Sequence, residues 1–164
     1  MSVKLNKVLI MNTEVTKNNR RYPKEVLESI RDQINSKDPS TQIGTMGFPE
    51  GLEINLRDAA FTYSNAVVEG DCLYVDISSL KTTMGDELVR RLELDRQFST
   101  SSVRFRPGGM ATTQGVPVEV KHTLNVPDVV NSDYKIISVA AIDESEDALN
   151  IPTDETDWEN VQDH

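Results

Sequence analysis

The chain has 164 residues, of which 37% are apolar and 5% aromatic, and this suits one globular domain with an aliphatic core. The formal net charge of −10 argues against a nucleic-acid-binding surface. No apolar run approaches the roughly 20 residues that a membrane-spanning helix needs. The single cysteine, Cys72, rules out an internal disulfide, and its apolar neighbours indicate a small buried hydrophobic residue. We therefore expect a soluble protein of a reducing compartment.

The negative charge is concentrated near the C-terminal end. Residues 143–164 hold nine acidic residues and neither lysine nor arginine. Of the 27 acidic residues in the chain, 27 − 9 = 18 remain in the preceding part, against 17 basic ones, so residues 1–142 are close to neutral. We interpret 1–142 as the domain and 143–164 as an acidic arm that a partner surface could order. Its expected partner-binding anchors are the apolar residues Leu149, Ile151, Trp158 and Val161.

The first half of the chain predicts a strand over 4–11 and then a helix that begins at Pro23. Proline suits a first helical turn because its missing N–H would be unpaired there. The helix is expected to fade near residues 36–39. Its buried face is predicted from the helical spacing of four aliphatic residues, Val26, Leu27, Ile30 and Ile34.

The middle of the chain predicts a hairpin followed by a second helix. Two β-prone runs, 59–68 and 72–80, flank a tight turn that contains Gly70. Residues 83–94 have aliphatic residues on one face, with acidic residues early and basic ones later, as the helix dipole favours. Further strands are predicted at 41–46, 98–106, 116–126 and 134–142, with a turn at Pro107-Gly108-Gly109 ending the second of them. With about seven strands and two helices, the fold class is α+β, with a compact, antiparallel, barrel-like β core.

Two features resemble the prohead proteases of tailed phages, a family related in fold to herpesvirus assemblin. The first is the stretch Asn18-Asn19-Arg20-Arg21-Tyr22-Pro23-Lys24, which is similar to that family's entry into its first helix. The second is the order of the later segments of the chain: a turn at 44–49, a hairpin, a helix, the paired serines Ser101-Ser102 and a late strand. The resemblance covers about residues 4–147 and implies a prohead-protease-like fold.

The resemblance also implies a serine-protease site, in which a histidine activates a strand serine because a hydroxyl is too weakly acidic to attack a peptide unaided. Ser101 matches the nucleophile. Phe48 stands where the family has the base histidine, and the late strand has Ala140 where the family often has an aspartate. These departures predict a degenerate site of Ser101, Phe48 and Ala140 with no catalytic residue, and hence a protein that is not an enzyme.

The expected function is that of a virion structural protein, a decoration or stabilisation protein of the phage capsid. Its partner would be the major capsid protein, with many copies on a shell or a homo-oligomer, in the virion and, during assembly, in the host cytoplasm. No cofactor, metal, nucleic acid or membrane is expected. Two alternatives stay open: an active maturation protease that uses Ser101 and His122 to cut scaffold and capsid proteins, and a tail-tube or other virion component.

Overall fold

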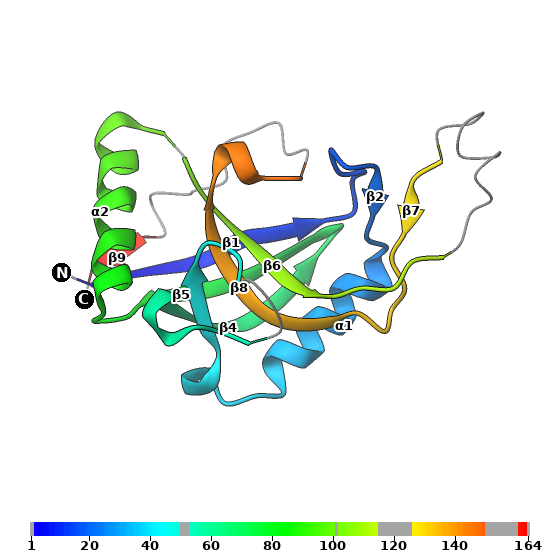
Figure 1. Ribbon diagram of the computed structural model, residues 1–164, viewed down its shortest axis with the longest axis horizontal. Coiled ribbons are helices and arrows are strands. Elements are labelled where there is room, and N and C mark those ends of the chain that lie inside the picture. The colour runs from blue at the N-terminus through cyan, green and yellow to red at the C-terminus, as the bar shows by residue number, and fades with distance from the viewer. Residues whose placement is uncertain (1, 50–52, 101, 115–125, 150–160, 164) are drawn as a thin grey trace.

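The computed structural model describes residues 2–49, 53–100, 102–114, 126–149 and 161–163. Its helices and strands, in chain order, are β1 (Val3–Asn12), β2 (Arg20–Arg21), α1 (Lys24–Asn35), β3 (Ile43–Met46), β4 (Ala59–Glu69), β5 (Cys72–Ser79), α2 (Thr83–Phe98), β6 (Val103–Met110), β7 (Asp128–Val129), β8 (Lys135–Asp143) and β9 (Val161–Asp163) (Figure 1). Short 3₁₀ helices lie at Pro39–Thr41, Leu56–Asp58 and Glu144–Glu146. Among the described residues, no helix is long and apolar enough to cross a membrane.

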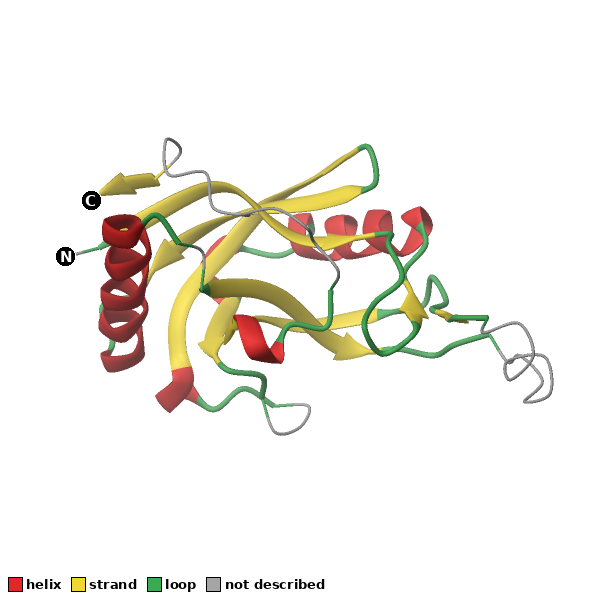
Figure 2. Ribbon diagram, turned by 90° about the horizontal axis from the view of Figure 1, so that it is seen from above, coloured by secondary structure: helices red, strands yellow, loops and turns green. Residues whose placement is uncertain are grey.

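Seven of the strands form one mixed sheet in the order β6-β8-β3-β4-β5-β1-β9. β3 and β8 are parallel, and the other neighbouring pairs are antiparallel. β1 contacts β6 although the two lie near opposite ends of this order, so the sheet is curled into a half-barrel (Figure 2). A separate parallel pair joins β2 to β7. The α+β class with a barrel-like β core is confirmed.

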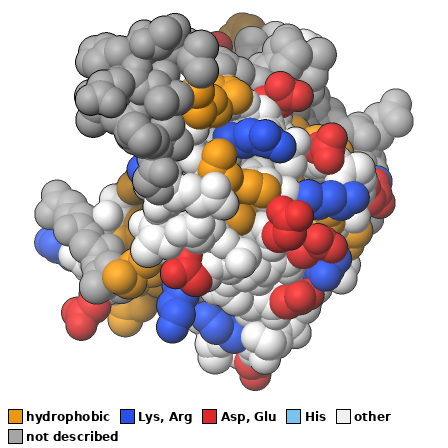
Figure 3. Space-filling view, turned by 90° about the vertical axis from the view of Figure 1, so that its right-hand side faces the viewer, with side chains coloured by type: hydrophobic (Ala, Val, Ile, Leu, Met, Phe, Trp, Pro, Cys, Tyr) orange, Lys and Arg blue, Asp and Glu red, His pale blue; other side chains and the backbone are white. Residues whose placement is uncertain are grey.

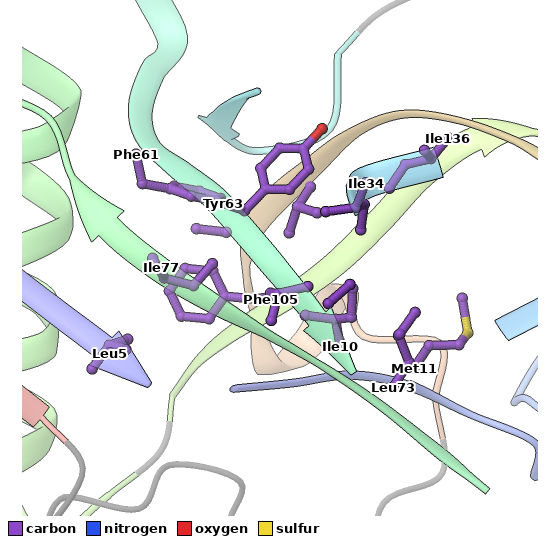
Figure 4. Close-up of a cluster of buried hydrophobic side chains, with 14 of the residues drawn as sticks. Leu5, Ile10, Met11, Ile34, Phe61, Tyr63, Leu73, Ile77, Phe105 and Ile136 are labelled. Atoms are coloured by element: carbon purple, nitrogen blue, oxygen red, sulfur yellow. The ribbon is translucent and has the colours of Figure 1, made fainter. Parts of the chain in front are cut away.

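The core fills the inside of this curl (Figure 4). The rings of Phe61 and Phe105 meet edge to face, with their centroids 5.2 Å apart. Gly44 makes room for them, because a Cβ at this position would overlap the Phe61 ring. The four aliphatic residues predicted to form the buried face of the first helix are all buried, and α1 packs against β4 and β8.

Two β-bulges bend the sheet on either side of β5. Lys7 in β1 and Asn65 in β4 both have left-handed backbone, with φ of 56° and 55°. The Asp76 carboxylate of β5 holds both, since it accepts the Lys7 backbone N–H at 2.9 Å and the Asn65 side-chain amide at 3.0 Å. A bulge strengthens the local twist and bends its strand, which helps a sheet to curl.

The structure differs from the sequence-based expectation at two boundaries near the serines. α2 continues to Phe98, which was predicted to start a strand. Pro107-Gly108-Gly109, predicted to end that strand, lies inside β6. β6 is the edge of the sheet, where the missing N–H of Pro107 interrupts no ladder. The strand predicted at 116–126 falls almost wholly outside the described residues, and β2, β7 and β9 were not predicted.

Candidate functional site

The paired serines lie in the connection between α2 and β6. Ser99 caps the helix with φ of 53° in the left-handed region, which turns the chain back toward the sheet. Ser102 is exposed and directly precedes β6. Ser101 itself lies outside the described residues. The described part of this connection, including the exposed Ser102, leads into β6 at the edge of the sheet.

A buried carboxylate holds this connection. Asp95 on α2 is only 3% exposed. One of its oxygens accepts the hydroxyls of Ser102 at 2.6 Å and Thr100 at 2.9 Å, and the other accepts the backbone N–H groups of Ser102 at 3.0 Å and Val103 at 3.2 Å. The Ser102 hydroxyl is therefore committed as a donor to Asp95, in contrast to a nucleophile activated by a histidine.

Asp95 was missed in the sequence, although it left a signal there. Leu88 and Leu92 mark the apolar face of the second predicted helix, and position 95 falls on the same face, three residues after Leu92. An acidic residue on a buried helix face needs polar partners. Thr100, Ser102 and the backbone N–H of Val103 supply them.

The turn after β3 carries Phe48. Gly47 has φ of +79°, and its N–H donates to the carbonyl of Ala141 at 2.8 Å, which fixes the turn against β8. The Phe48 side chain is 44% exposed and lies over Gly108 of β6. A Cβ added at Gly108 would lie 3.4 Å from the Phe48 ring, so glycine leaves the ring room to approach the strand.

Ala140 is buried in β8, where it pairs with Arg106 of β6 on one side and Thr45 of β3 on the other. It therefore lies beside the strand that leads into the Phe48 turn. If Phe48 takes the place of the base histidine, as the resemblance implies, its ring should pack near Ser101; this stays a prediction because Ser101 is not described. The described neighbour Ser102 lies six residues before Gly108, a path of about 20 Å along an extended strand.

A buried ion pair lies on the same side of β6 as Phe48, and both line one cavity. Arg106 and Asp147 have side chains only 4% and 6% exposed, and the guanidinium Nε and Nη2 each donate to one carboxylate oxygen at 2.9 Å. The Arg106 Nη1 group donates to the carbonyls of Phe105 and Leu9, which ties β6 to β1. Burial alone would raise the pKa of Asp147. The hydrogen bonds and positive charge of Arg106, together with the Leu149 N–H and the charge of Arg104, outweigh it and hold that pKa below its usual value of 3.8.

Asp147 belongs to a segment that we call the strap, residues 144–149, which lies against the body. At one end the Glu144 N–H donates to the Ser102 carbonyl at 3.1 Å. At the other end the Lys17 N–H donates to the Ala148 carbonyl at 2.7 Å. Leu149 is 6% exposed and belongs to the hydrophobic core. The strap thus runs from the serine connection to the loop before β2.

The burial of Leu149 bears on the predicted acidic arm. Leu149 was expected to anchor a partner, but a side chain already buried in its own domain cannot do so. Ile151 and Trp158 lie outside the described residues, and the backbone of Val161 begins β9, which pairs with the start of β1. The folded body therefore extends past residue 142 to the end of the strap.

A cavity of about 130 Å³ opens between the strap, the Phe48 turn, β6 and the loop before β2. Seven of its lining residues are hydrophobic: Met11, Tyr22, Phe48, Pro107, Ile142, Ala148 and Leu149. Arg106 and Asp147 also line it. Of the two described residues that were predicted to form the protease-like site, Phe48 lines this cavity and Ala140 does not.

The described residues hold no group of three or more His, Cys, Asp or Glu side chains that could bind a metal ion. Both histidines, His122 and His164, lie outside the described residues, so the pairing of His122 with Ser101 stays a prediction. Cys72 is half-buried at the start of β5 and makes no disulfide.

No family model matches the sequence, and no curated protein is significantly similar to it. Among solved structures, the fold is similar to that of the capsid assembly protease gp21 of bacteriophage T4. The TM-score is 0.62 at 20% sequence identity, over 83% of this chain and 79% of that one. The expectation that this chain is not an enzyme is contradicted, because the structure it resembles is that of a protease. The comparison confirms a prohead-protease-like fold.

Proposed function

We propose that this chain works in the assembly of a tailed-phage head, where it engages capsid or scaffold proteins. One observation carries the proposal: the fold is similar to that of a capsid assembly protease, and the similarity covers most of both chains. Fold alone does not fix function, since one fold hosts many activities. The proposal therefore also draws on the surface around β6.

Three properties of this surface suit an extended segment of another protein. β6 is an edge strand that pairs only with β8 among the described strands, and edge strands are where an extended peptide can add to a sheet. Phe48 and Met110 expose apolar surface beside or on this strand, with Met110 54% exposed. The cavity under the strap lies beside the same strand. Main-chain pairing with one side-chain pocket is a common way of binding extended peptides.

In the finer form of this proposal, the chain is a decoration or stabilisation protein that binds the major capsid protein in many copies. This role requires that the protein stays with the mature particle. Quantitative mass spectrometry of purified virions tests it, with the major capsid protein as internal standard. A structural component should be found in tens of copies or more per particle. The role is contradicted if the protein is present in proheads but absent from the mature virions that form from them.

The second candidate is a serine-type maturation protease, and two observations favour it: the similarity in fold to a protease, and the paired serines of the sequence, of which Ser102 is exposed. Purified chain would be incubated with the cognate scaffold and capsid proteins, and new termini identified by mass spectrometry. Cleavage that Ser101→Ala abolishes and Ser102→Ala does not would assign the nucleophile to Ser101. Binding without cleavage in the same mixture would favour the decoration role. If the chain neither binds nor cleaves these proteins, the head-assembly proposal itself is contradicted.

A further inference from the structure

We infer that the cavity beside Phe48 receives one apolar side chain from an extended segment of a head protein, and that a basic residue flanks this side chain. The inference rests on the proposed function and names the chemistry of the partner. It follows from the size of the cavity, the state of its floor and the charge of its lip.

The size and walls of the cavity suit a single apolar side chain. Its volume is about 130 Å³. An apolar cavity of about 150 Å³ holds a benzene-sized group. The apolar walls come from four separate segments. Met11 lies near the end of β1, Phe48 on the turn after β3, Pro107 in β6, and Leu149 at the end of the strap. Filling it would bury apolar surface on both partners, which is the main favourable term in association.

The floor of the cavity offers little attraction to a charged group. Arg106 and Asp147 line it, but each already faces the other in a two-pronged ion pair. The remaining Arg106 nitrogen donates to two backbone carbonyls. A charged ligand group would therefore lose its own hydration without gaining a free counter-charge, a costly exchange. An uncharged side chain meets no such cost.

The lip of the cavity on the strap side is acidic. Glu146 lines the cavity, and Glu144 lies two residues before it on the strap, with both side chains exposed. Within the described part of the chain, no ion pair joins either carboxylate to a cation. On the opposite side the lining residues Thr16 and Asn18 are uncharged, and the exposed Lys17 between them does not line the cavity. The local field thus favours a cation beside the bound side chain, within the screening length of about 8–10 Å at physiological salt.

The surrounding surface extends this pattern. On the face that carries β2 and β7, apolar side chains lie beside both basic and acidic ones (Figure 3). Val15, next to the cavity-lining Thr16, is 39% exposed. A segment seated in the cavity would therefore have further apolar surface to cover on its way past the loop before β2.

A cavity-filling substitution tests the pocket with a matched control. Ala148 is exposed, lines the cavity and contributes only its backbone carbonyl to the strap's hydrogen bonds. Ala148→Leu should fill the cavity while leaving the strap attached. Ser145→Leu adds the same side chain at an exposed strap position that does not line the cavity. The probes are the purified cognate scaffold and major capsid proteins, and short overlapping peptides that cover both sequences. Thermal melting of each variant checks its fold.

Ala148→Leu should weaken the affinity about tenfold, which corresponds to about 1.4 kcal/mol. Ser145→Leu should change it by no more than about twofold, as is usual for surface substitutions. Glu146→Lys should weaken binding and reduce its salt dependence, whereas Glu93→Lys on the exposed side of α2 should do neither. Bound peptides should share an apolar residue next to a lysine or arginine.

Different results would contradict this inference and the proposed function. Unchanged binding of head proteins by a folded Ala148→Leu variant would overturn the pocket and leave the head-assembly role standing. The same holds if the bound peptides show no basic residue beside the apolar one. If the wild-type chain binds neither the head proteins nor their peptides, the proposed function fails, and the inference fails with it.

Discussion

At the scale of single residues, Asp147 stabilises the attachment of the strap. Its carboxylate makes a buried, two-pronged ion pair with Arg106 and also accepts the Leu149 N–H at 3.0 Å. Asp147→Asn removes the charge that compensates a buried guanidinium. Breaking a buried pair from one side costs about 3–5 kcal/mol. We expect a loss of this size in the free energy of unfolding, measured with denaturant. Glu146→Gln, at the exposed neighbouring position, should change it by less than about 0.5 kcal/mol.

The contribution of Asp147 to the free energy of unfolding should decrease in acid. Because the folded pKa of Asp147 is lowered, the folded chain favours the carboxylate more than the unfolded chain does. Its contribution is fully present above the unfolded pKa of about 3.9 and is lost as the pH falls through the folded value. The stability difference between wild type and Asp147→Asn should therefore narrow below about pH 4. A difference that stays constant into strong acid would contradict the ion pair as its source.

At the scale of elements, the junction between α2 and β6 depends on Asp95. Asp95→Asn replaces an oxygen that accepts hydrogen bonds with an amide group that donates them, so either the two backbone N–H groups or the two hydroxyls lose a proper acceptor. Each unsatisfied buried group costs about 1–3 kcal/mol. We expect faster amide hydrogen exchange at Ser102 and Val103, with little change in the centre of β6. Glu93→Gln, on the same helix, should leave exchange at both amides unchanged. Equal protection in both variants would show that Asp95 does not hold the junction.

This junction also shows what the sequence could and could not predict. The apolar spacing of the second helix was sufficient to place α2, but its end depends on Asp95 capturing groups seven and eight residues further along the chain. Local spacing does not show such a contact, so Phe98 was assigned to a strand. Pro107 was taken as a strand end because proline breaks ladders. Only the position of β6 at the sheet edge makes it harmless there.

The candidate site was harder to predict than the fold. The turn at Phe48 and the serine connection were both recognised from short motifs, but these motifs carry no distance between them. The cavity was not predicted at all, because its walls come from segments that the fold assembles from opposite ends of the sequence, such as Met11 and Leu149. The ion pair of Arg106 with Asp147 spans 41 residues and left no periodic signal.

At the scale of the whole molecule, the question is where the folded body ends. The composition predicted that the folded body ends at residue 142, because the nine acidic residues beyond it repel one another. Asp147, however, is neutralised by Arg106, and Leu149 adds to the core. The proposal of an acidic arm that binds the shell therefore concerns the residues after Leu149, with Ile151, Trp158 and Val161 as anchors. Attachment through such an arm should weaken as salt rises, because exposed charges are screened.

Two truncations separate the strap from the arm. Both remove the C-terminal residues that include β9, and they differ only in whether residues 144–149 are kept. The chain that ends at Leu149 should remain folded. The chain that ends at Asp143 leaves Arg106 buried without its partner, at a cost of about 3–5 kcal/mol, and forfeits the burial of Leu149, worth about 1.5–3 kcal/mol. This approaches the whole stability of many domains, about 5–15 kcal/mol, so it should unfold at much lower denaturant concentration or not fold at all. If both chains unfold at the same denaturant concentration, the strap is not part of the body.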